Sequence, residues 1–183
     1  EGFEVNTVEL AGVQYRNFAT LPANLAQYFT VMLQHAEKEF AVYLDERYTF
    51  GQGYQRSCEF GAALVERYGL VKGDRVAILS RNNPQWMMAF IGITSVGCVA
   101  VPMNGWWTTE ELDYGFADSG AKIVVADRAR VQRLATIVEK HDLHIIAIDD
   151  CSGLGVEHTV FAELLREFSG RGMPEKEVAL EDH

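Results

Sequence analysis

The segment from Asn82 to Thr109 contains no Asp, Glu, Lys or Arg, and these 28 residues constrain the fold of the chain more than any other feature. An uncharged stretch longer than about 18 residues must first be considered as a membrane-spanning helix. Gly92, Gly97 and Pro102 interrupt this one, and hydroxyl and amide side chains lie within and around it. The uninterrupted apolar pieces are too short to cross a bilayer, so we expect no transmembrane segment here.

A helix, a glycine turn and a short strand account for the uncharged segment. Asn83 is interpreted as a helix N-cap rather than a binding residue, and Pro84 suits the first helical position. Residues 86–95 are apolar nearly all round, which is typical of a helix buried on several sides. Gly97 would end this helix, and residues 98–101 would form a buried strand. Such continuous apolar character favours an α/β protein, in which both faces of the central strands are covered.

Further helices and strands follow from hydrophobic spacing and end signals. Thr108 and Glu111 have the spacing of a capping box for a helix that Gly120 would end. Four other segments have one apolar stripe at helical spacing, and Asn24 is a possible cap for the first: 25–36, 54–65, 131–138 and 161–168. Short β-branched runs predict buried strands at 76–79, 98–101, 123–126 and 145–148. Weaker strand signals at 41–44 and 48–50 suggest a hairpin.

The order of these elements predicts an α/β fold with a largely parallel sheet flanked by helices. Strand and helix alternate from about residue 75 to 168, and the connections are short enough for right-handed crossovers. We expect residues 1–23 to be an N-terminal lead-in and residues 24–168 to form the α/β subdomain. Residues 169–183 are rich in Ser, Gly, Pro and charge, so they are expected to form a linker.

Charge and cysteine content limit the classes of function. The 183 residues carry 26 acidic and 16 basic side chains, a net charge of −10, without a Lys/Arg cluster. A nucleic-acid partner is therefore not expected, because nothing would neutralise phosphates. Cys58, Cys98 and Cys151 are odd in number and far apart, which indicates reduced thiols. The N-terminal residues do not resemble a signal peptide, so we expect a cytoplasmic protein.

A ligand site is expected where the parallel strands end. In open α/β sheets, ligands bind beyond the carboxyl ends of the strands. Asn104, Trp106 and Trp107 are the candidate substrate-proximal residues, because adjacent tryptophans after a strand can line a pocket for an apolar or flat ligand. The alternative is that one Trp packs the Thr108 helix against the sheet and the other covers a domain or subunit boundary. The other strand-end positions are 80–83, 127 and 149–150.

Two apparent motifs are not interpreted as sites. Gly51 and Gly53 begin a pattern similar to a dinucleotide fingerprint, but Arg56 stands where close helix packing needs Gly or Ala. His141 and His144 could be metal ligands, but a solvated helix end is the favoured interpretation. No motif in the sequence joins a nucleophile to a base. The residues alone therefore assign no catalytic, cofactor-binding or metal-binding side chain.

A family resemblance explains this combination of an α/β fold and absent catalytic motifs. The turn at 72–77 (KGDRVA) leads into a strand, 97–104 (GCVAVPMN) passes from helix to strand, and 111–121 (ELDYGFADSGA) follows. In this order they resemble the N-terminal region of adenylate-forming enzymes, which include acyl-CoA synthetases, luciferases and peptide-synthetase adenylation domains. The likeness is strongest over 68–127. Trp106 and Trp107 after Asn104 are similar to what many fatty acid CoA ligases carry.

The resemblance implies a two-step ligase reaction on a small-molecule carboxylate. The carboxylate attacks the α-phosphate of ATP to give an acyl-adenylate and pyrophosphate, and the thiol of CoA then displaces AMP. Mg²⁺ would offset phosphate charge in the first step. The phosphate loop, ribose-binding Asp and catalytic Lys of the family are expected beyond His183. We therefore expect this chain alone to be inactive and to bind ATP, Mg²⁺ and CoA only weakly.

Two other functions stay open at this point. The chain could be a non-catalytic α/β module that binds a small ligand or a partner through Trp106 and Trp107. A dehydrogenase is a third possibility, which absence of NAD(P) binding would exclude. If the chain is a subdomain of a ligase, surface that met the rest of the enzyme would be exposed, and self-association would be expected.

Overall fold

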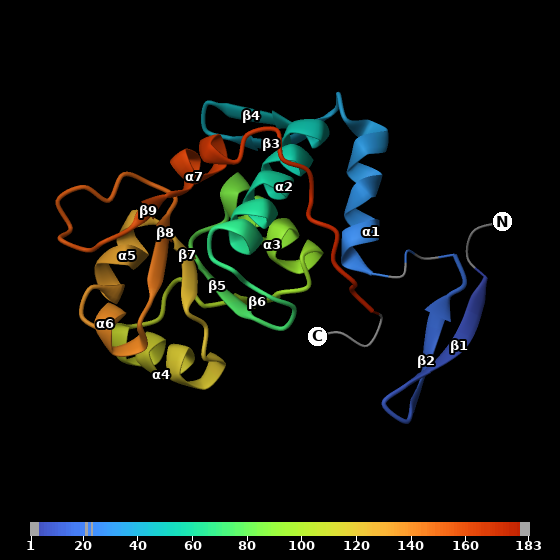
Figure 1. The fold of residues 1–183 in the computed structure, drawn as a ribbon, viewed down its shortest axis with the longest axis horizontal. Helices are drawn as coiled ribbons and strands as arrows, with labels where there is room; N and C mark the ends of the chain where they lie inside the picture. The colour runs from blue at the N-terminus through green and yellow to red at the C-terminus, as the bar shows by residue number, and fades with distance from the viewer. Residues whose placement is uncertain (1–3, 21, 23, 180–183) are drawn as a thin grey trace.

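The computed structural model describes residues 4–20, 22 and 24–179, and its central feature is a parallel sheet with helices on both faces (Figure 1). The five strands lie in the order β6-β5-β7-β8-β9, and every neighbouring pair is parallel. This confirms the predicted fold class. The strands are β5 (Arg75–Leu79), β6 (Val99–Pro102), β7 (Ile123–Ala126), β8 (His144–Ala147) and β9 (Thr159–Val160).

Alternate residues of the interior strand β5 belong to two separate hydrophobic cores. Val76 and Ile78 belong to the core under α2 (Phe50–Glu66), α3 (Pro84–Ser95) and α7 (Phe161–Glu167). Ala77 and Leu79 belong to the core on the opposite face, under α4 (Thr109–Ser119), α5 (Arg128–Leu134) and α6 (Val138–His141). Successive side chains of a strand point to opposite faces, so an uninterrupted apolar strand requires cover on both sides.

The uncharged segment folds as its residues predict. Asn83 caps α3 by accepting a hydrogen bond from the Trp86 N–H at 2.8 Å, and Pro84 is the first helical residue. Gly97 turns the chain with a φ of 77°, and Gly120 ends α4 with a φ of 65°. The capping box at the start of α4 is also present. The strand after Gly97 is displaced by one residue from its predicted position, as is β8.

Helix α2 begins earlier than predicted. Thr49 and Gln52 form a capping box that starts the helix at Phe50, so the predicted strand 48–50 and helix start at 54 were wrong at this boundary. The expected hairpin is present as β3 (Glu39–Tyr43) and β4 (Glu46–Thr49). Gly51 and Gly53 lie inside the first turns of α2, where an added Cβ on Gly53 would be 2.7 Å from Cδ1 of Phe40. The two glycines therefore serve helix packing and do not form a dinucleotide loop.

Two predicted helices are divided. The segment 25–36 contains α1 (Leu25–Phe29), capped by Asn24, followed by the 3₁₀ helix η1 (Thr30–His35). The segment 131–138 is interrupted between α5 and α6, where the Ile137 N–H bonds the Leu134 carbonyl at 2.9 Å. Residues 136–138 are all β-branched, which lowers helix propensity and explains a break at this point.

The structure adds a hairpin in the N-terminal lead-in that the sequence analysis did not predict. Strands β1 (Val5–Leu10) and β2 (Val13–Phe18) pair antiparallel around Ala11 and Gly12, which both have positive φ. Positive φ at both central residues is typical of a two-residue hairpin turn. Figure 1 shows this hairpin standing apart from the parallel sheet. Residues 1–3, 21 and 23 of the lead-in lie outside the described residues.

The chain after α7 packs back on the body before it reaches its end. Met173 contacts the core formed by α2 and α3. The carbonyl of Val178 accepts a hydrogen bond from the Asn24 side chain at 2.8 Å. The division at 168 stays a prediction, and residues 180–183 lie outside the described part of the chain. In the part that is described, each helix is too short or too polar to cross a bilayer.

Candidate functional site

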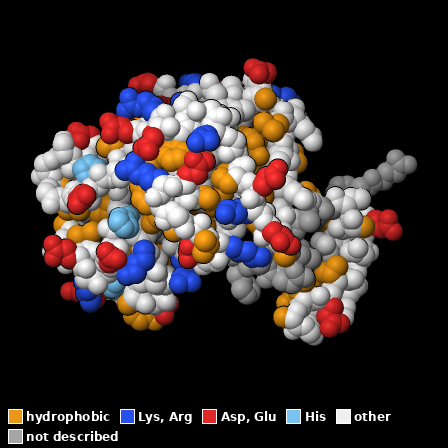
Figure 2. All heavy atoms as spheres, viewed as in Figure 1, with side chains coloured by type: hydrophobic (Ala, Val, Ile, Leu, Met, Phe, Trp, Pro, Cys, Tyr) orange, Lys and Arg blue, Asp and Glu red, His pale blue; other side chains and the backbone are white. Residues whose placement is uncertain are grey.

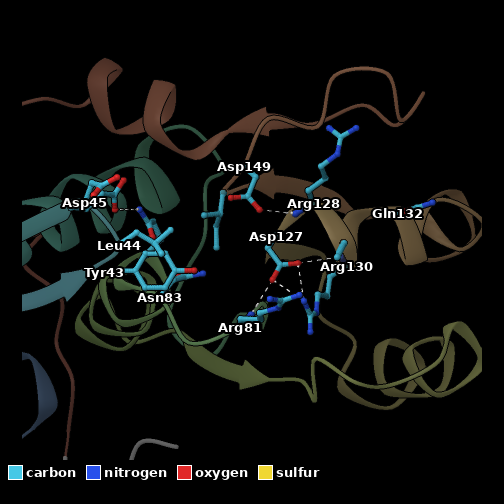
Figure 3. Close-up of a pocket in the computed structure, with 14 residues that line it drawn as sticks. Tyr43, Leu44, Asp45, Arg81, Asn83, Asp127, Arg128, Arg130, Gln132 and Asp149 are labelled. Atoms are coloured by element: carbon cyan, nitrogen blue, oxygen red, sulfur yellow. Dashed lines mark hydrogen bonds and ion pairs between the residues drawn. The ribbon is translucent and has the colours of Figure 1, made fainter.

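The carboxyl ends of β5 and β7 are joined by one carboxylate. Asp127 follows β7, and its Oδ2 accepts a hydrogen bond from the backbone N–H of Arg81 after β5 at 3.0 Å. Its Oδ1 accepts a hydrogen bond from the backbone N–H of Arg130 at 3.2 Å, so Asp127 is the N-cap of α5. The same carboxylate forms an ion pair with the Arg130 guanidinium at 3.1 Å. Figure 3 shows Arg81 and Arg130 converging on Asp127.

Two arginines of α5 hold the loop that follows β6. Arg130 is 2% exposed, and its Nε donates to the carbonyl of Gly105 at 2.9 Å. Arg133 donates to the carbonyls of Gly105 at 2.9 Å and Trp107 at 3.0 Å. The loop that contains the candidate residues is therefore fixed from the neighbouring βα unit and not by its own sequence alone.

The three predicted site residues share this loop but have different surroundings. Trp106 is 80% exposed, and the Arg130 guanidinium carbon lies 5.9 Å from its ring centroid. Trp107 is half-buried against the core beneath α4, so close to Gly115 that an added Cβ there would be 2.9 Å from its ring. Asn104 is exposed, and its Oδ1 accepts from the Trp106 N–H at 2.9 Å. Trp107 thus packs α4 against the sheet, whereas Trp106 faces solvent.

A cavity of about 670 Å³ opens beyond the ends of β5, β7 and β8. Figure 3 shows residues from the β3–β4 turn on one side of it and from α5 on the other. Strand-end reasoning anticipated Arg81, Asn83, Asp127 and Asp149, but not the β3–β4 turn at 43–46, because nothing local links that hairpin to the sheet edge. Asn104, Trp106 and Trp107 lie outside the described wall of this cavity.

Acidic and basic side chains alternate around this cavity. Arg130 is paired with Asp127, and Arg128 donates from its backbone to Asp149 at 3.0 Å and from its side chain to the carbonyls of Asp150 and Ser152. Figure 2 likewise shows Lys and Arg interspersed with Asp and Glu on the visible face. The described lining of the cavity therefore has no strong excess of either charge.

The two histidines once considered as metal ligands have separate neighbours. His141 Nε2 lies 2.7 Å from Asp113 Oδ1, and Lys140 lies 2.6 Å from the other oxygen of the same carboxylate. Hydrogen bonds from Lys140 and His141 lower the pKa of Asp113. His144 starts β8, with its ring centroid 6.2 Å from that of Tyr68. Among the described residues, His, Cys, Asp and Glu do not assemble into a group of three that could hold a metal ion.

The cysteines are also structural. Cys58, Cys98 and Cys151 are free and buried. Burial raises the pKa of all three thiols, that of Cys98 to about 11, so they stay protonated at neutral pH. A protonated buried thiol is a poor nucleophile.

Comparison with known proteins gives a consistent result. The family model described as AMP-binding enzyme matches residues 29–177. The long-chain-fatty-acid–CoA ligase of Salmonella typhimurium is 34% identical over 121 residues, which are 63% of this chain and 22% of that protein. The 4-hydroxybutyrate–CoA ligase 2 of Metallosphaera sedula is 29% identical over 128 residues, or 70% of this chain and 23% of that protein. The chain therefore spans less than a quarter of the length of these curated relatives.

Solved structures agree at the level of the fold. An anthranilate CoA ligase in complex with anthranoyl-AMP has a TM-score of 0.74 at 23% identity, and the match covers 83% of this chain and 30% of that one. A benzoate CoA ligase from Burkholderia xenovorans has a TM-score of 0.72 at 23% identity, covering 84% of this chain and 29% of that one.

Proposed function

The chain belongs to the AMP-binding enzyme family, and on that premise we propose that it is the N-terminal α/β subdomain of an ATP-dependent acyl-CoA synthetase. The observation that carries this proposal is the 34% identity over 121 residues to a protein named long-chain-fatty-acid–CoA ligase. The complete enzyme would convert a fatty acid to its acyl-adenylate and then to the CoA thioester.

Within this proposal, Asn104, Trp106 and Trp107 form the substrate-proximal part of the subdomain. The high exposure of Trp106 at the carboxyl edge of the sheet supports direct contact with a ligand. Trp107 anchors the loop beneath α4, and Asn104 accepts from the Trp106 backbone. Their role is to bind and orient, and no chemical step is assigned to them.

ATP, Mg²⁺ and CoA would be needed by the complete enzyme. The described residues do not offer a cluster of three metal-ligating side chains, and the charges around the cavity beyond β5, β7 and β8 are balanced. We therefore assign neither phosphate nor Mg²⁺ binding to this subdomain. Residues elsewhere in the complete enzyme would bind these ligands.

The test is pyrophosphate release by the purified 183-residue chain with ATP, Mg²⁺ and a panel of fatty acids. We expect no turnover above background, because the proposal assigns the binding of the ATP phosphates and of Mg²⁺ to residues elsewhere in the complete enzyme. The complete protein assayed under the same conditions is the control and should release pyrophosphate. Turnover by the short chain would contradict the proposal that it is an inactive part.

A non-catalytic binding module is the second candidate, and the exposure of Trp106 favours it. Tryptophan fluorescence titrated with acyl-CoA distinguishes the two functions. A tight, saturable response of the isolated chain would support the module. Concentration-dependent self-association without a ligand response would support a subdomain whose contact surface is exposed, and exposed Tyr15, Tyr28 and Leu44 are consistent with such a surface. In either case, the buried free thiols support a reducing, cytoplasmic setting.

A further inference from the structure

The carbonyl groups of the loop after β6 are bound by side chains from α5. Arg130 and Arg133 both donate to the carbonyl of Gly105 at 2.9 Å, and Arg133 also donates to that of Trp107 at 3.0 Å. The two arginines are three residues apart, so they lie on the same side of the helix. In return, the Thr109 hydroxyl donates to the Arg133 carbonyl at 3.1 Å. Hydrogen bonds therefore run in both directions between α5 and the segment from Gly105 to Thr109, the first residue of α4.

The packing around Gly105 is consistent with a fixed loop. An added Cβ on Gly105 would lie 3.1 and 3.2 Å from nitrogens of the Arg130 guanidinium. Such a contact is tight, so a larger residue would push Arg130 away from the carbonyl it binds. The absence of a side chain at 105 is what allows the guanidinium to approach the backbone.

The buried guanidinium of Arg130 lies close to the exposed ring of Trp106. Burial of an arginine is costly unless it is paired, and here Asp127 supplies the opposite charge at 3.1 Å. The guanidinium carbon lies 5.9 Å from the ring centroid of Trp106, which is itself 80% exposed. Trp106 is thus held by a cation–π contact and by its backbone, and only to a small extent by burial.

We propose that Arg130 and Arg133 are positioning residues that hold Trp106 as a preorganised aromatic surface for ligand binding, an inference that rests on the proposed function of Trp106. An exposed tryptophan on an unrestrained loop would lose conformational freedom when a ligand binds. Restraint in the free protein removes part of that cost, so affinity is gained without a new contact.

The first experiment needs no ligand. In the ¹⁵N-labelled chain, the heteronuclear NOE of each indole N–H reports mobility on the ps–ns timescale, and Trp106→Phe identifies its signal. We expect Arg133→Met to lower the NOE of Trp106 and to leave that of Trp86 unchanged. Arg133→Lys keeps a cationic donor and should retain most of the wild-type value.

Two further variants keep the test decisive. Arg166→Met is the matched control, because Arg166 is an exposed helical arginine on α7 that pairs with Glu163. Gly105→Ala displaces Arg130 without removing a charge and should also lower the Trp106 NOE. If the heteronuclear NOE of the Trp106 indole were unchanged in both Arg133→Met and Gly105→Ala, the proposal that the two arginines position Trp106 would be wrong.

The second experiment uses the complete enzyme. We expect Arg133→Met to raise the KM for fatty acid or for CoA by about fivefold with little change in kcat, and Trp106→Ala to raise the same KM. An effect of Trp106→Ala without one of Arg133→Met would overturn the positioning role. If neither variant changed a KM although the indole became mobile, Trp106 would not be a ligand-binding residue, and the proposed function of the loop would fail instead.

Discussion

Gly92 and Gly61 allow helices α2 and α3 to pack with their backbones close together. A Cβ added to Gly92 would lie 2.8 Å from the carbonyl oxygen of Ser57 and 3.0 Å from the ring of Phe60. A Cβ on Gly61 would lie 2.8 Å from the sulfur of Met173 and 3.1 Å from Val96. In the sequence Gly92 appears only as a break in an apolar run, whereas in the fold it is the point where two helices meet.

At the residue scale, we predict that Gly92→Ala destabilises the chain by about 2–3 kcal/mol, because the added methyl group clashes with backbone that cannot rotate away. The measurement is the free energy of unfolding in urea. Gly172→Ala is the matched control, since an added Cβ there meets nothing within 4 Å. Equal stability of the two variants would show that α2 and α3 can separate without cost.

At the element scale, α4 and α6 are joined by one carboxylate. Asp113 on α4 contacts Lys140 at 2.6 Å and His141 at 2.7 Å, both on α6. Helix α6 is only four residues long, and so short a helix depends on tertiary contacts for its stability. Because the carboxylate of Asp113 joins the two helices, the attachment of α6 should depend on pH.

We predict that acid weakens the attachment of α6 through protonation of Asp113. Because the folded-state pKa of Asp113 is lowered by Lys140 and His141, its contribution is complete above the unfolded pKa of about 3.9 and is lost as pH falls from there to the folded value. Amide hydrogen exchange of residues 138–141 between pH 5 and 3 measures this loss. In Asp113→Asn the exchange should be faster at pH 5 and should show less additional opening on acidification. A wild-type pH profile in that variant would assign the effect to another group.

At the scale of the whole molecule, the N-terminal hairpin and the parallel sheet are separate units. Val5, Val13, Tyr15 and Phe18 of the hairpin are between 41% and 50% exposed, so much of their apolar surface remains in contact with solvent. An isolated two-stranded hairpin is marginally stable in water. The stability of the sheet and its helices should therefore not depend on it.

We predict that removal of residues 1–20 changes the thermal unfolding midpoint of the body by less than about 2 °C. Circular dichroism of the shortened and intact chains provides the measurement. The Gly92→Ala chain serves as the positive control, because the same assay must detect its lower midpoint. A fall comparable to that of Gly92→Ala would mean that the hairpin is part of the folding unit.

Local signals determined the fold class and most of the element ends. Apolar strands that alternate with amphipathic helices along the chain predicted the α/β architecture. Asn83 and Thr108 marked helix starts, and Gly97 and Gly120 marked turns. These signals could be recognised in the sequence because caps and positive-φ turns act over only a few residues. The sequence also located Asn104, Trp106 and Trp107 at a strand end. It missed the N-terminal hairpin, whose strands alternate weakly and whose Ala-Gly turn is a poor signal.

Only the tertiary structure decided which of these residues meet. The contacts of Arg130 and Arg133 with the loop at 105–107 join residues about 25 positions apart, and the β3–β4 turn reaches the cavity from still further away. Such contacts depend on strand order and crossover geometry, which bring distant segments to one edge of the sheet. The sequence by itself therefore determined what each element is and which family the chain resembles. The packed sheet determined that Trp107 is half-buried and Trp106 exposed, and that two arginines of α5 contact the loop that carries them.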